Sequence, residues 1–441
     1  MSLRGSDPYF SVVASSRNDD HGDNLRPRMQ MFVDGLAAQA NRHRLQTELI
    51  VVEWNPPCGR PPLSDVLRWP PRSEFFSARI VTVPHDLHAK FEHAQKLPLF
   101  QMIAKNVGIR RARGRFVLAT NIDILFSDAV FHRFSELKPG LIYRCDRYDV
   151  PTEAAMRSLD EIFAFCRQNA FRINARGRTL VRLGGNWRVV GHAGLAAACR
   201  ARIDACTLRL RREFVRRRAQ LKLIWIMPGV IRRVLKDAFA EDRGFRRFDK
   251  IFFDRVALVL ARQAVRCLTW PARGINRTAG RLEGWFSSIK RDRRDRTLHT
   301  NACGDFTLMA REDWFRLRGY PEWPIFSWHI DSVILHQARA NGMREIDWPT
   351  GAHVYHIEHG HGSGYTPEGA EKLFARLDSL GVPYLSWPEF KVMADEMYDA
   401  KRLLKAVVFN EDNWGLADVV LPETELGSTK PDQTRRIMER A

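Results

Sequence analysis

The sequence lacks the features that place a protein in a membrane or outside the cell. Its 441 residues include no run of about 20 apolar residues, the length that a helix needs to cross a bilayer. The first ten residues, MSLRGSDPYF, lack the apolar stretch of a signal peptide. The seven cysteines are scattered and none forms a CxxC pair, so neither a zinc ribbon nor a disulfide framework is indicated. We therefore expect a cytoplasmic protein with reduced thiols.

The composition is that of a globular protein, but its charge is distributed unevenly. Hydrophobic residues make up 45% and charged residues 27% of the chain, which is enough apolar material for a sizeable core. The net charge is +19. Residues 201–296 contain 26 Lys/Arg and 10 Asp/Glu and therefore carry +16, which leaves +3 for all other residues. The basic character belongs to one segment and should be explained by that segment's partner.

The first third of the chain alternates between apolar strand patterns and helical patterns. Continuous apolar stretches of this kind are typical of parallel strands that are buried on both faces. The pattern predicts an α/β fold with a mainly parallel sheet flanked by helices. In such sheets, ligands bind beyond the carboxyl ends of the strands. The predicted strands cover residues 9–16, 48–54, 78–84 and 116–126, and the predicted helices cover residues 29–40 and 98–113.

The character of the sequence changes along the chain and predicts four parts. Residues 1–150 carry the strand and helix alternation described above. Residues 151–300 are rich in Arg with short amphipathic stretches, which predicts a basic and mostly helical insertion. Residues 301–365 again have the sequence character of a compact enzyme domain, and a helix is predicted from about His329 to Gly342. Residues 366–441 predict a C-terminal helical extension of two helices and a polar end.

Two residues that follow short apolar stretches are candidate metal ligands. Asp123 lies at the exit of the predicted strand in FVLATNIDILF, and His356 follows an apolar stretch in VYHIEH. A divalent cation takes carboxylate oxygens and, when it is manganese-like, an imidazole nitrogen as well. We therefore predict Asp123 and His356 as ligands of Mn²⁺ or Mg²⁺. Each also has an ordinary interpretation, Asp123 as a buried capping residue and His356 as a hydrogen-bonded structural residue.

The segment around His356 also admits a different metal chemistry. HIEHGH brings His356, Glu358, His359 and His361 together within six residues. Such a cluster could serve a metal-dependent hydrolase, although it is not the HExxH motif and its strand setting differs from the helical form. The glycine-rich stretch 360–364 that follows could close as a lid over a bound ligand.

Two carboxylates in the third part are candidate catalytic groups. Asp331 lies near the start of the predicted helix in WHIDSVI, where a general base could take a proton from an attacking hydroxyl. The ordinary interpretation is an acidic residue that complements the helix dipole. Asp305, in GDFTLM, is a second candidate, either as the base or as a group that holds acceptor hydroxyls. Tryptophans in the same part could stack on sugar rings or belong to the core; they are Trp314, Trp323 and Trp328.

Taken together in order and spacing, these segments resemble glycosyltransferases of the GT-A fold, a Rossmann-like architecture. The resemblance is to family 2 members, with a galactosyltransferase-type C-terminal half, and covers residues 9–150 and 301–365. It is carried by SVVASSRND, LIVVEWN, KNVGIRRARGRFVLATNIDILF, and GDFTLM followed by WFRLRGYPEWPIFSWHIDS and VYHIEH. Residues 151–300 have no counterpart in this resemblance.

The resemblance implies a nucleotide-sugar site at the ends of the first strands. Arg17 and Asp19 would line the nucleotide pocket, and Glu53 would lie beside the base or ribose. The helix with the pattern N.G...A.G would lie beside the donor and contributes Asn106. The residues of that pattern are Asn106, Gly108, Ala112 and Gly114.

The resemblance also implies roles at the reacting centre. Asn121-Ile122-Asp123 takes the place of the DxD motif that binds metal and diphosphate, and the chain departs from it by having Asn first. Asp123 would then provide most of the metal contact. Asp331 matches the base of inverting members, although Ile330 stands where an acidic residue is usual. His356 matches the late histidine ligand of galactosyltransferase-like members.

The basic segment 201–296 suggests a partner of its own. Leu, Ile, Trp and Phe are interleaved with Arg, which favours helices at an anionic membrane surface. A lipid-linked acceptor would explain such an element, and it would place the protein at the inner face of the membrane. An amphipathic subdomain with a solvated Arg face is the ordinary alternative. Nucleic-acid binding is disfavoured because no RNP, KH or finger pattern is present.

We therefore expect an inverting, metal-assisted glycosyltransferase of the hexosyltransferase type. It would move a sugar from a nucleotide-sugar donor to a hydroxyl of a glycan or glycolipid in polysaccharide biosynthesis. A metal-dependent hydrolase that uses the His356, His359 and His361 cluster is one alternative. A catalytically inactive scaffold at the membrane surface is the other, and the Asn at position 121 keeps it open.

Overall fold

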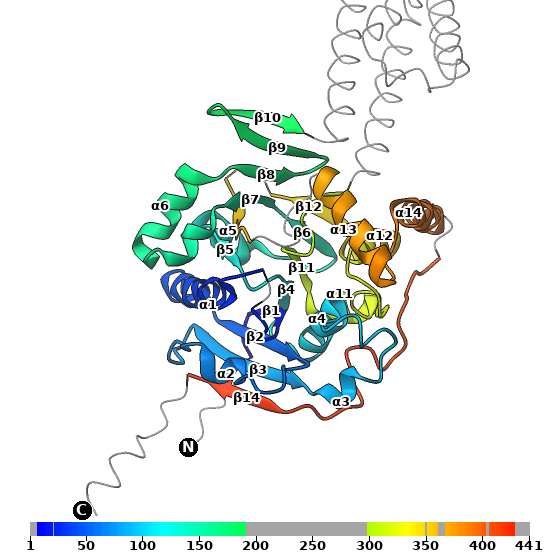
Figure 1. Ribbon diagram of the computed structural model, residues 1–441, viewed down its shortest axis with the longest axis horizontal. Helices are drawn as coiled ribbons and strands as arrows, with labels where there is room; N and C mark the ends of the chain where they lie inside the picture. Colours follow the sequence, from blue (N-terminus) through cyan, green and yellow to red (C-terminus); the bar gives the residue numbers. More distant parts are fainter. Residues whose placement is uncertain are drawn as a thin grey trace, which may run out of the picture. The chain divides into compact units, whose positions relative to one another are not determined.

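The central feature of the computed structural model is a mixed sheet of eight strands, in the order β12-β6-β11-β4-β1-β2-β3-β14 (Figure 1). The neighbours β4, β1, β2 and β3 are all parallel to one another. Strand β12 is parallel to β6, while β11 and β14 run antiparallel to their neighbours. The strands are β1 Phe10–Ser16, β2 Thr47–Trp54, β3 Phe76–Val83, β4 Phe116–Ala119, β6 Leu141–Arg144, β11 Thr307–Ala310, β12 Arg344–Asp347 and β14 Glu423–Leu426.

The structure describes residues 7–20, 22–190, 298–348, 351–359, 367–402 and 405–427. The described residues on both sides of 191–297 belong to one compact unit. The basic segment 201–296, the predicted lid at 360–364 and His361 lie outside the described residues. Among the residues that are described, no helix has both the length and the apolarity that a membrane span requires.

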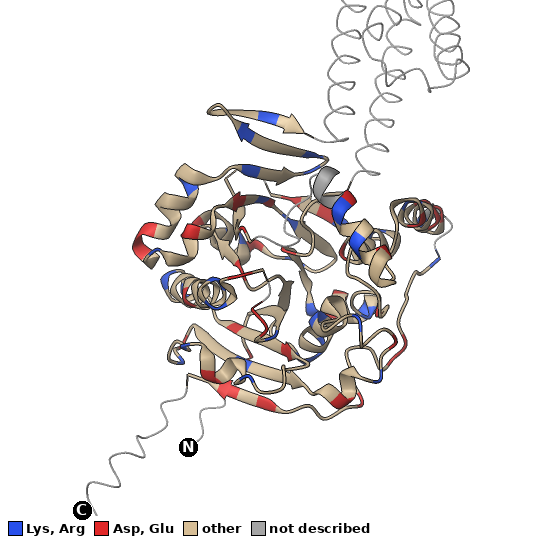
Figure 2. Ribbon diagram, in the orientation of Figure 1, with Lys and Arg blue, Asp and Glu red and all other residues tan. Residues whose placement is uncertain are grey.

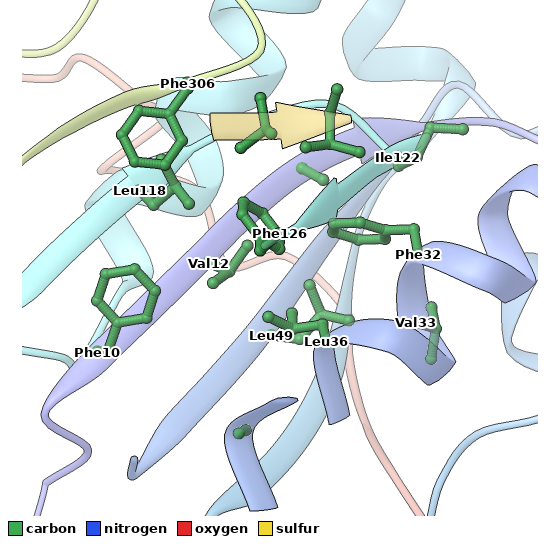
Figure 3. Packing of buried hydrophobic residues seen from close by; sticks show 14 of the residues in the cluster. Phe10, Val12, Phe32, Val33, Leu36, Leu49, Leu118, Ile122, Phe126 and Phe306 are labelled. Atoms are coloured by element: carbon green, nitrogen blue, oxygen red, sulfur yellow. The ribbon is translucent and has the colours of Figure 1, made fainter. Parts of the chain in front are cut away.

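Helices cover the two faces of the eight-stranded sheet because its strands are apolar on both sides. Val12 of β1 packs in one hydrophobic cluster with Phe32 and Leu36 of α1 (Leu25–Arg42) (Figure 3). The next residue, Val13, packs in a second cluster with Ile103 and other residues of α4 (Gln101–Arg111). Successive side chains of a strand point to opposite faces, so β1 contributes to both layers. The α/β prediction with helices on both faces of a mainly parallel sheet is confirmed.

A second sheet of six strands has the order β10-β9-β8-β7-β13-β5. Its strands are β5 Ile124–Phe126, β7 Asp146–Val150, β8 Arg172–Ala175, β9 Arg178–Leu183, β10 Asn186–Val190 and β13 His353–Ile357. The chain leaves the first sheet at Ala119 and enters the second at Ile124. The continuous strand predicted over residues 116–126 is therefore two strands, and the polar link 120–123 joins the two sheets. In this link the side chains of Thr120 and Asn121 both hydrogen-bond to Asp305.

Part of the stretch predicted as helical insertion is β structure. Residues 172–190 form β8, β9 and β10, and Figure 2 shows the basic residues of the β9–β10 hairpin. Gly184 and Gly185 have φ angles of 55° and 82°, which a two-residue hairpin turn of the primed type requires. The described part of the predicted insertion therefore contains three strands besides helix, and the prediction that the insertion is mostly helical stays a prediction. Helix α6 (Leu159–Asn169) precedes the three strands.

The remaining helices mostly agree with the predictions, and the C-terminal part adds a strand. Helices α12, α13 and α14 match those predicted after residue 329 and in the C-terminal extension. Strand β14 was not predicted. The remaining helices are α2 Leu63–Val66, α3 His85–His88, α5 Asp128–Arg133, α11 Arg311–Leu317, α12 Ile330–Ala340, α13 Pro367–Leu380, α14 Trp387–Arg402, and the 3₁₀ helices η1 Phe134–Glu136 and η2 Thr152–Met156. The division into four parts stays a prediction.

Candidate functional site

Asp123 lies at the end of the link between the two sheets, and its carboxylate is divided between two environments. The residue is 5% exposed. Its Oδ2 accepts a hydrogen bond from Nη1 of the buried Arg28 at 2.9 Å. Its Oδ1 is buried and has no hydrogen-bond partner in the structure. A buried carboxylate oxygen without a partner is costly, so this atom is suited to a ligand that the protein itself does not supply.

His356 faces Asp123 from the neighbouring strand. On β13 it lies opposite Ile124 of β5, and the backbone N–H of Ile357 donates to the carbonyl oxygen of Asp123 at 3.0 Å. His356 Nε2 is 3.7 Å from Asp123 Oδ2. The structure thus brings together the two residues that were predicted as metal ligands. Their assignment as ligands stays a prediction.

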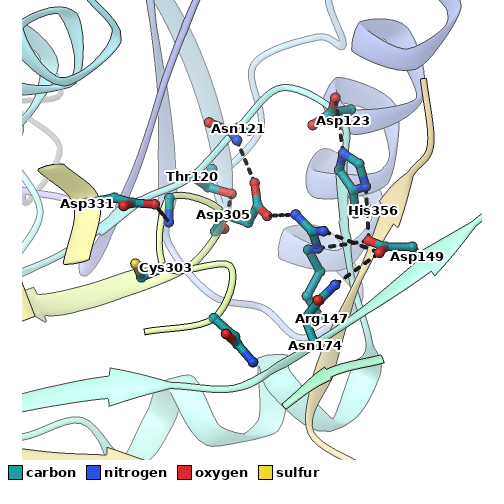
Figure 4. Close-up of polar contacts among 12 residues, drawn as sticks. Thr120, Asn121, Asp123, Arg147, Asp149, Asn174, Cys303, Asp305, Asp331 and His356 are labelled. Atoms are coloured by element: carbon teal, nitrogen blue, oxygen red, sulfur yellow. Dashed lines mark hydrogen bonds and ion pairs between the residues drawn. The ribbon is translucent and has the colours of Figure 1, made fainter. Parts of the chain in front are cut away.

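A second carboxylate orients the His356 ring. His356 Nδ1 lies 3.1 Å from Asp149 Oδ1 on β7 (Figure 4). Asp149 Oδ1 accepts a hydrogen bond from the Nδ1–H of His356, which fixes the ring with Nε2 facing Asp123. Metal-binding histidines are commonly held by a carboxylate in this way. Burial and Arg147 act to lower the pKa of His356, but the carboxylates of Asp123 and Asp149 raise it above its ordinary value.

His359 approaches Asp123 from the end of the described β13 segment. Its Nε2 is 3.4 Å from Asp123 Oδ2. One ligand atom from each of Asp123, His356 and His359 lies within 4.8 Å of the others. Gly22 allows the approach: its φ is +75°, and a Cβ there would lie 2.5 Å from His359 Nδ1. The backbone of the loop after β1 therefore passes against this imidazole.

The three side chains fit a divalent cation of the manganese or zinc type. One carboxylate with two imidazoles is a mixed O and N donor set, which borderline cations prefer over Mg²⁺. The unpartnered Oδ1 of Asp123 and the carboxylate-held ring of His356 both favour such an ion. The positive charge of Arg28 beside Asp123 acts against it. The site can thus hold a cation while Arg28 fixes the carboxylate.

Asn121 faces away from this cation site, and its contacts explain why the residue is an amide. Its Oδ1 accepts from Lys105 Nζ at 2.8 Å and from Gln101 Nε2 at 2.9 Å, and its Nδ2 donates to Asp305 Oδ1. An Asp at this position would place a second negative charge against Asp305. Burial lowers the pKa of Lys105 to about 8, and its Nζ also donates to the Gly304 carbonyl at 2.7 Å.

Asp305 is held as a carboxylate with both oxygens engaged. Its Oδ1 accepts from Asn121 and its Oδ2 from Arg147. Burial acts to raise its pKa, but Arg147 together with nearby cations brings it below its ordinary value. The hydroxyl of Thr120 donates to the Asp305 carbonyl at 2.6 Å. These contacts suit a residue that joins β4 to β11 better than one that takes up protons.

Asp331 has the electrostatic setting of a general base. It lies in the first turn of α12, where its Oδ2 accepts from the backbone N–H of Gly304 at 2.9 Å. Burial raises its pKa above the ordinary value. A carboxylate with a raised pKa holds a proton more readily near neutral pH. Of the two predicted catalytic carboxylates, Asp331 is the better suited to proton transfer.

The predicted nucleotide residues lie at the carboxyl ends of β1 and β2. Arg17 Nε is 3.5 Å from Asp19 Oδ2. Glu53 is opposite Ser16 in the sheet register, and its Oε1 accepts from the Leu63 N–H at 2.9 Å. Burial raises the pKa of Glu53. These side chains share one edge of the sheet, and their contact with a nucleotide stays a prediction.

Two other predicted residues belong to the interior. Asn106 is 0% exposed: its Nδ2 donates to the Tyr320 carbonyl and to Glu322, and its Oδ1 accepts from the Tyr320 N–H. It holds the turn after α11 against α4 and has no surface to offer a donor. Trp314 is also 0% exposed, and its indole N–H donates to the Val117 carbonyl. It packs in the core and cannot stack on a sugar.

Sequence reasoning missed the arginines and the carboxylate that hold the site in place. Asp149 is buried between Arg147 and Arg172, and these cations hold its pKa well below the ordinary value although burial acts to raise it. The signal was present in DRYDV, where Arg147 and Asp149 alternate with apolar residues and so share one face of a strand.

Comparison with known proteins adds little to this geometry. No family model matches the sequence, and a search of curated proteins gave no match. Among solved structures, the chain is similar to the crystal structure of GalNAc-T7 with UDP, GalNAc and Mn²⁺, with a TM-score of 0.35 and 10% sequence identity. The similarity covers 92% of this chain and 53% of that one, so the chain spans about half the length of that structure. A likeness at this TM-score assigns no function.

Proposed function

We propose that the protein is a glycosyltransferase that moves a sugar from a nucleotide-sugar donor to a hydroxyl of a glycan or glycolipid. The observation that carries the proposal is the convergence of Asp123, His356 and His359 at the link between the two sheets. This link follows the carboxyl end of β4, where α/β sheets bind their ligands. The order of the sequence segments that resemble GT-A enzymes supports the same reaction class.

We propose a role for each residue of the site. Asp123, His356 and His359 would hold Mn²⁺ or a similar ion, which neutralises charge that develops on the departing nucleoside diphosphate. Asp149 keeps the Nε2 of His356 directed at this position. Arg17, Asp19 and Glu53 would bind the nucleotide at the ends of β1 and β2.

Asp331 would take the proton from the acceptor hydroxyl as that oxygen attacks the sugar. Its Oδ2 accepts from the Gly304 N–H at 2.9 Å and its Oδ1 from the more distant Ser332 hydroxyl at 3.4 Å, so the proton would go to Oδ1. Direct attack of this kind inverts the anomeric centre. Asp305 fixes Asn121 and Arg147 beside this centre. A lipid-linked acceptor would meet the basic segment 201–296, which the structure does not describe.

A metal-dependent hydrolase is the second candidate, because two imidazoles and one carboxylate also suit a metal that activates water. It predicts turnover of phosphate or carboxylic esters without nucleotide-sugar binding. The position of the site at the edge of a parallel sheet, together with the nucleotide-type residues after β1 and β2, favours the transferase.

The test measures nucleoside diphosphate release from a panel of nucleotide-sugars with the full chain, with and without Mn²⁺. We expect Asp123→Asn and His359→Gln each to lower Mn²⁺-dependent release at least 100-fold. Asp128→Asn is the matched control: this residue lies in the same segment, but it is half exposed and pairs with Arg42, so release should be unchanged. Thermal melting shows whether each variant is folded. If Asp123→Asn is unstable, the result for His359→Gln decides the test, because His359 is less buried.

A nucleoside diphosphate should also raise the melting temperature of the parent, because ligands that bind only the native state stabilise it. Full release by His359→Gln, or no thermal response to any nucleoside diphosphate, would contradict the transferase. Hydrolysis of aryl phosphates or esters under the same conditions would favour the second candidate instead.

A further inference from the structure

A second group of one imidazole and two carboxylates lies apart from the proposed active site. Its members are Asp146 at the start of β7, His299, and Asp347 at the end of β12. One ligand atom from each lies within 4.8 Å of the others. His299 is 0% exposed, whereas the side chains of Asp146 and Asp347 are 22% and 23% exposed. The imidazole is therefore fixed in the interior, and the carboxylates reach it from a side open to solvent.

The two nitrogens of His299 are in different situations. Nδ1 is 2.8 Å from Asp347 Oδ1 and is hydrogen-bonded to it. Nε2 is buried, has no hydrogen-bond partner, and is directed at Asp146 Oδ1 at 3.9 Å, which is too far for a hydrogen bond. Two ligand atoms bound to one tetrahedral zinc ion at about 2.0–2.1 Å lie roughly 3.3 Å apart. The gap thus needs only a small closure to hold a cation.

The surroundings assign a separate task to each carboxylate. Arg176 Nε lies 3.7 Å from Asp347 Oδ2, while Oδ1 of the same group binds His299. Asp347 is thereby committed to orienting the ring. Asp146 Oδ1 faces the other ring nitrogen, Nε2, at 3.9 Å, so Asp146 is the carboxylate placed to share a cation with the ring.

The hydrogen bond between Nδ1 and Asp347 fixes the imidazole ring of His299 and leaves Nε2 facing Asp146. Its backbone is fixed as well: the N–H of His299 donates to Glu345 Oε1 at 2.7 Å, and its carbonyl accepts from Arg144 Nε at 2.9 Å.

We propose that His299 Nε2 and the Asp146 carboxylate bind a divalent cation of the zinc type, with Asp347 as the carboxylate that orients the imidazole and water as the remaining ligands. The site joins β7 and β12 to the first described residues after 191–297. It would therefore couple a bound cation to the described residues that lead into β11 of the first sheet. The site is distinct from Asp123, His356 and His359, and it does not depend on the proposed transferase reaction.

The experiment is equilibrium dialysis of the full chain against buffered free Zn²⁺, with bound zinc measured per chain. Asp146→Asn removes a ligand with little change of shape and should lose one equivalent of bound zinc. Asp347→Asn should retain the equivalent but weaken its Kd ten- to 100-fold, as the loss of a ring-orienting carboxylate does. Asp160→Asn, an exposed carboxylate at the start of α6, is the matched control and should bind as the parent does.

A variant of the Asp123, His356 and His359 cluster distinguishes the two sites. His359→Gln should reduce binding at Asp123 without altering the equivalent that Asp146→Asn removes. Equal zinc content in Asp146→Asn and the Asp160→Asn control would overturn the proposal. It would also be overturned if the parent binds a single zinc ion and His359→Gln loses that ion. His299→Gln provides a second ligand variant, and thermal melting in EDTA shows that each variant is folded before its zinc content is compared.

Discussion

The two histidine–carboxylate clusters of this protein have nearly the same geometry and opposite electrostatics. In each, an Asp lies at Nδ1, at 3.1 Å for His356 and 2.8 Å for His299. In each, Nε2 faces a second Asp, at 3.7 Å and 3.9 Å respectively. Yet the pKa of His356 is raised and that of His299 is lowered. The immediate partners of an imidazole therefore do not by themselves decide the direction in which its pKa shifts.

The difference comes from the depth of the carboxylates. Asp123 and Asp149 are buried with His356, so their negative charges act on the ring with little screening. Asp347 is partly exposed, and at His299 burial of the ring together with Arg144 and Arg176 outweighs it. The same three side-chain types thus raise the pKa of one imidazole and lower that of the other.

Replacing the carboxylate that orients each imidazole should give the largest difference in stability between the two clusters. Asp149→Asn leaves Arg147 and Arg172 buried without their shared anion, and we expect a loss of about 3–5 kcal/mol in the free energy of unfolding. Asp347→Asn disturbs a partly exposed group and should lose about 1 kcal/mol. Urea unfolding of both variants measures the contrast. Equal losses would show that burial does not distinguish the clusters.

A buried cation beside the first cluster predicts a particular pH dependence. The pKa of Lys105 is about 8 in the folded protein, against about 10.4 for an unfolded chain. Between these values the unfolded chain binds more protons, so the free energy of unfolding should rise with pH, by about 3 kcal/mol in total. Lys105→Met should remove this rise. Parallel stability–pH curves for parent and variant between pH 8 and 10 would refute the assignment.

The smallest expected effect tests why position 121 carries an amide. Asn121→Asp restores the acidic residue of a DxD motif but sets it against Asp305, with only Lys105 in compensation. We expect a loss of about 1–2 kcal/mol at neutral pH, because a donated hydrogen bond is replaced by a repulsion. We also expect no gain in Mn²⁺ affinity. Tighter Mn²⁺ binding by this variant, measured by calorimetry, would mean that residue 121 faces the cation.

Strand and helix patterns were readable from the sequence wherever the periodicity was strong. The buried run of β2 and the helical spacing of α1 are local features, and the structure contains both elements. Asp123 and His356 were found because each follows a short apolar stretch. Local sequence patterns therefore located the strands and helices, and they also located the two apolar stretches that lead to Asp123 and His356.

Contacts between distant parts of the chain could not be read in this way. Arg28 and Asp123 are 95 residues apart, and Asp149 and His356 are 207 apart. The sequence alone does not distinguish Lys105 from an exposed helical lysine; the tertiary structure shows that its Nζ donates to the Gly304 carbonyl. No single-sequence pattern states which charges meet, so the roles of Arg28, Lys105 and Asp149 come from the tertiary structure.

Strand β14 has a consequence for how the sheet ends. It pairs antiparallel with β3, and Arg79 of β3 binds Glu423 of β14, so residues near the C-terminus cover the backbone groups of β3. An uncovered strand at this position would offer its N–H and C=O groups to other chains and invite aggregation. The four-residue β14 thus replaces the eight-residue β3 as the edge of the sheet, and a short edge strand offers fewer free backbone groups to other chains.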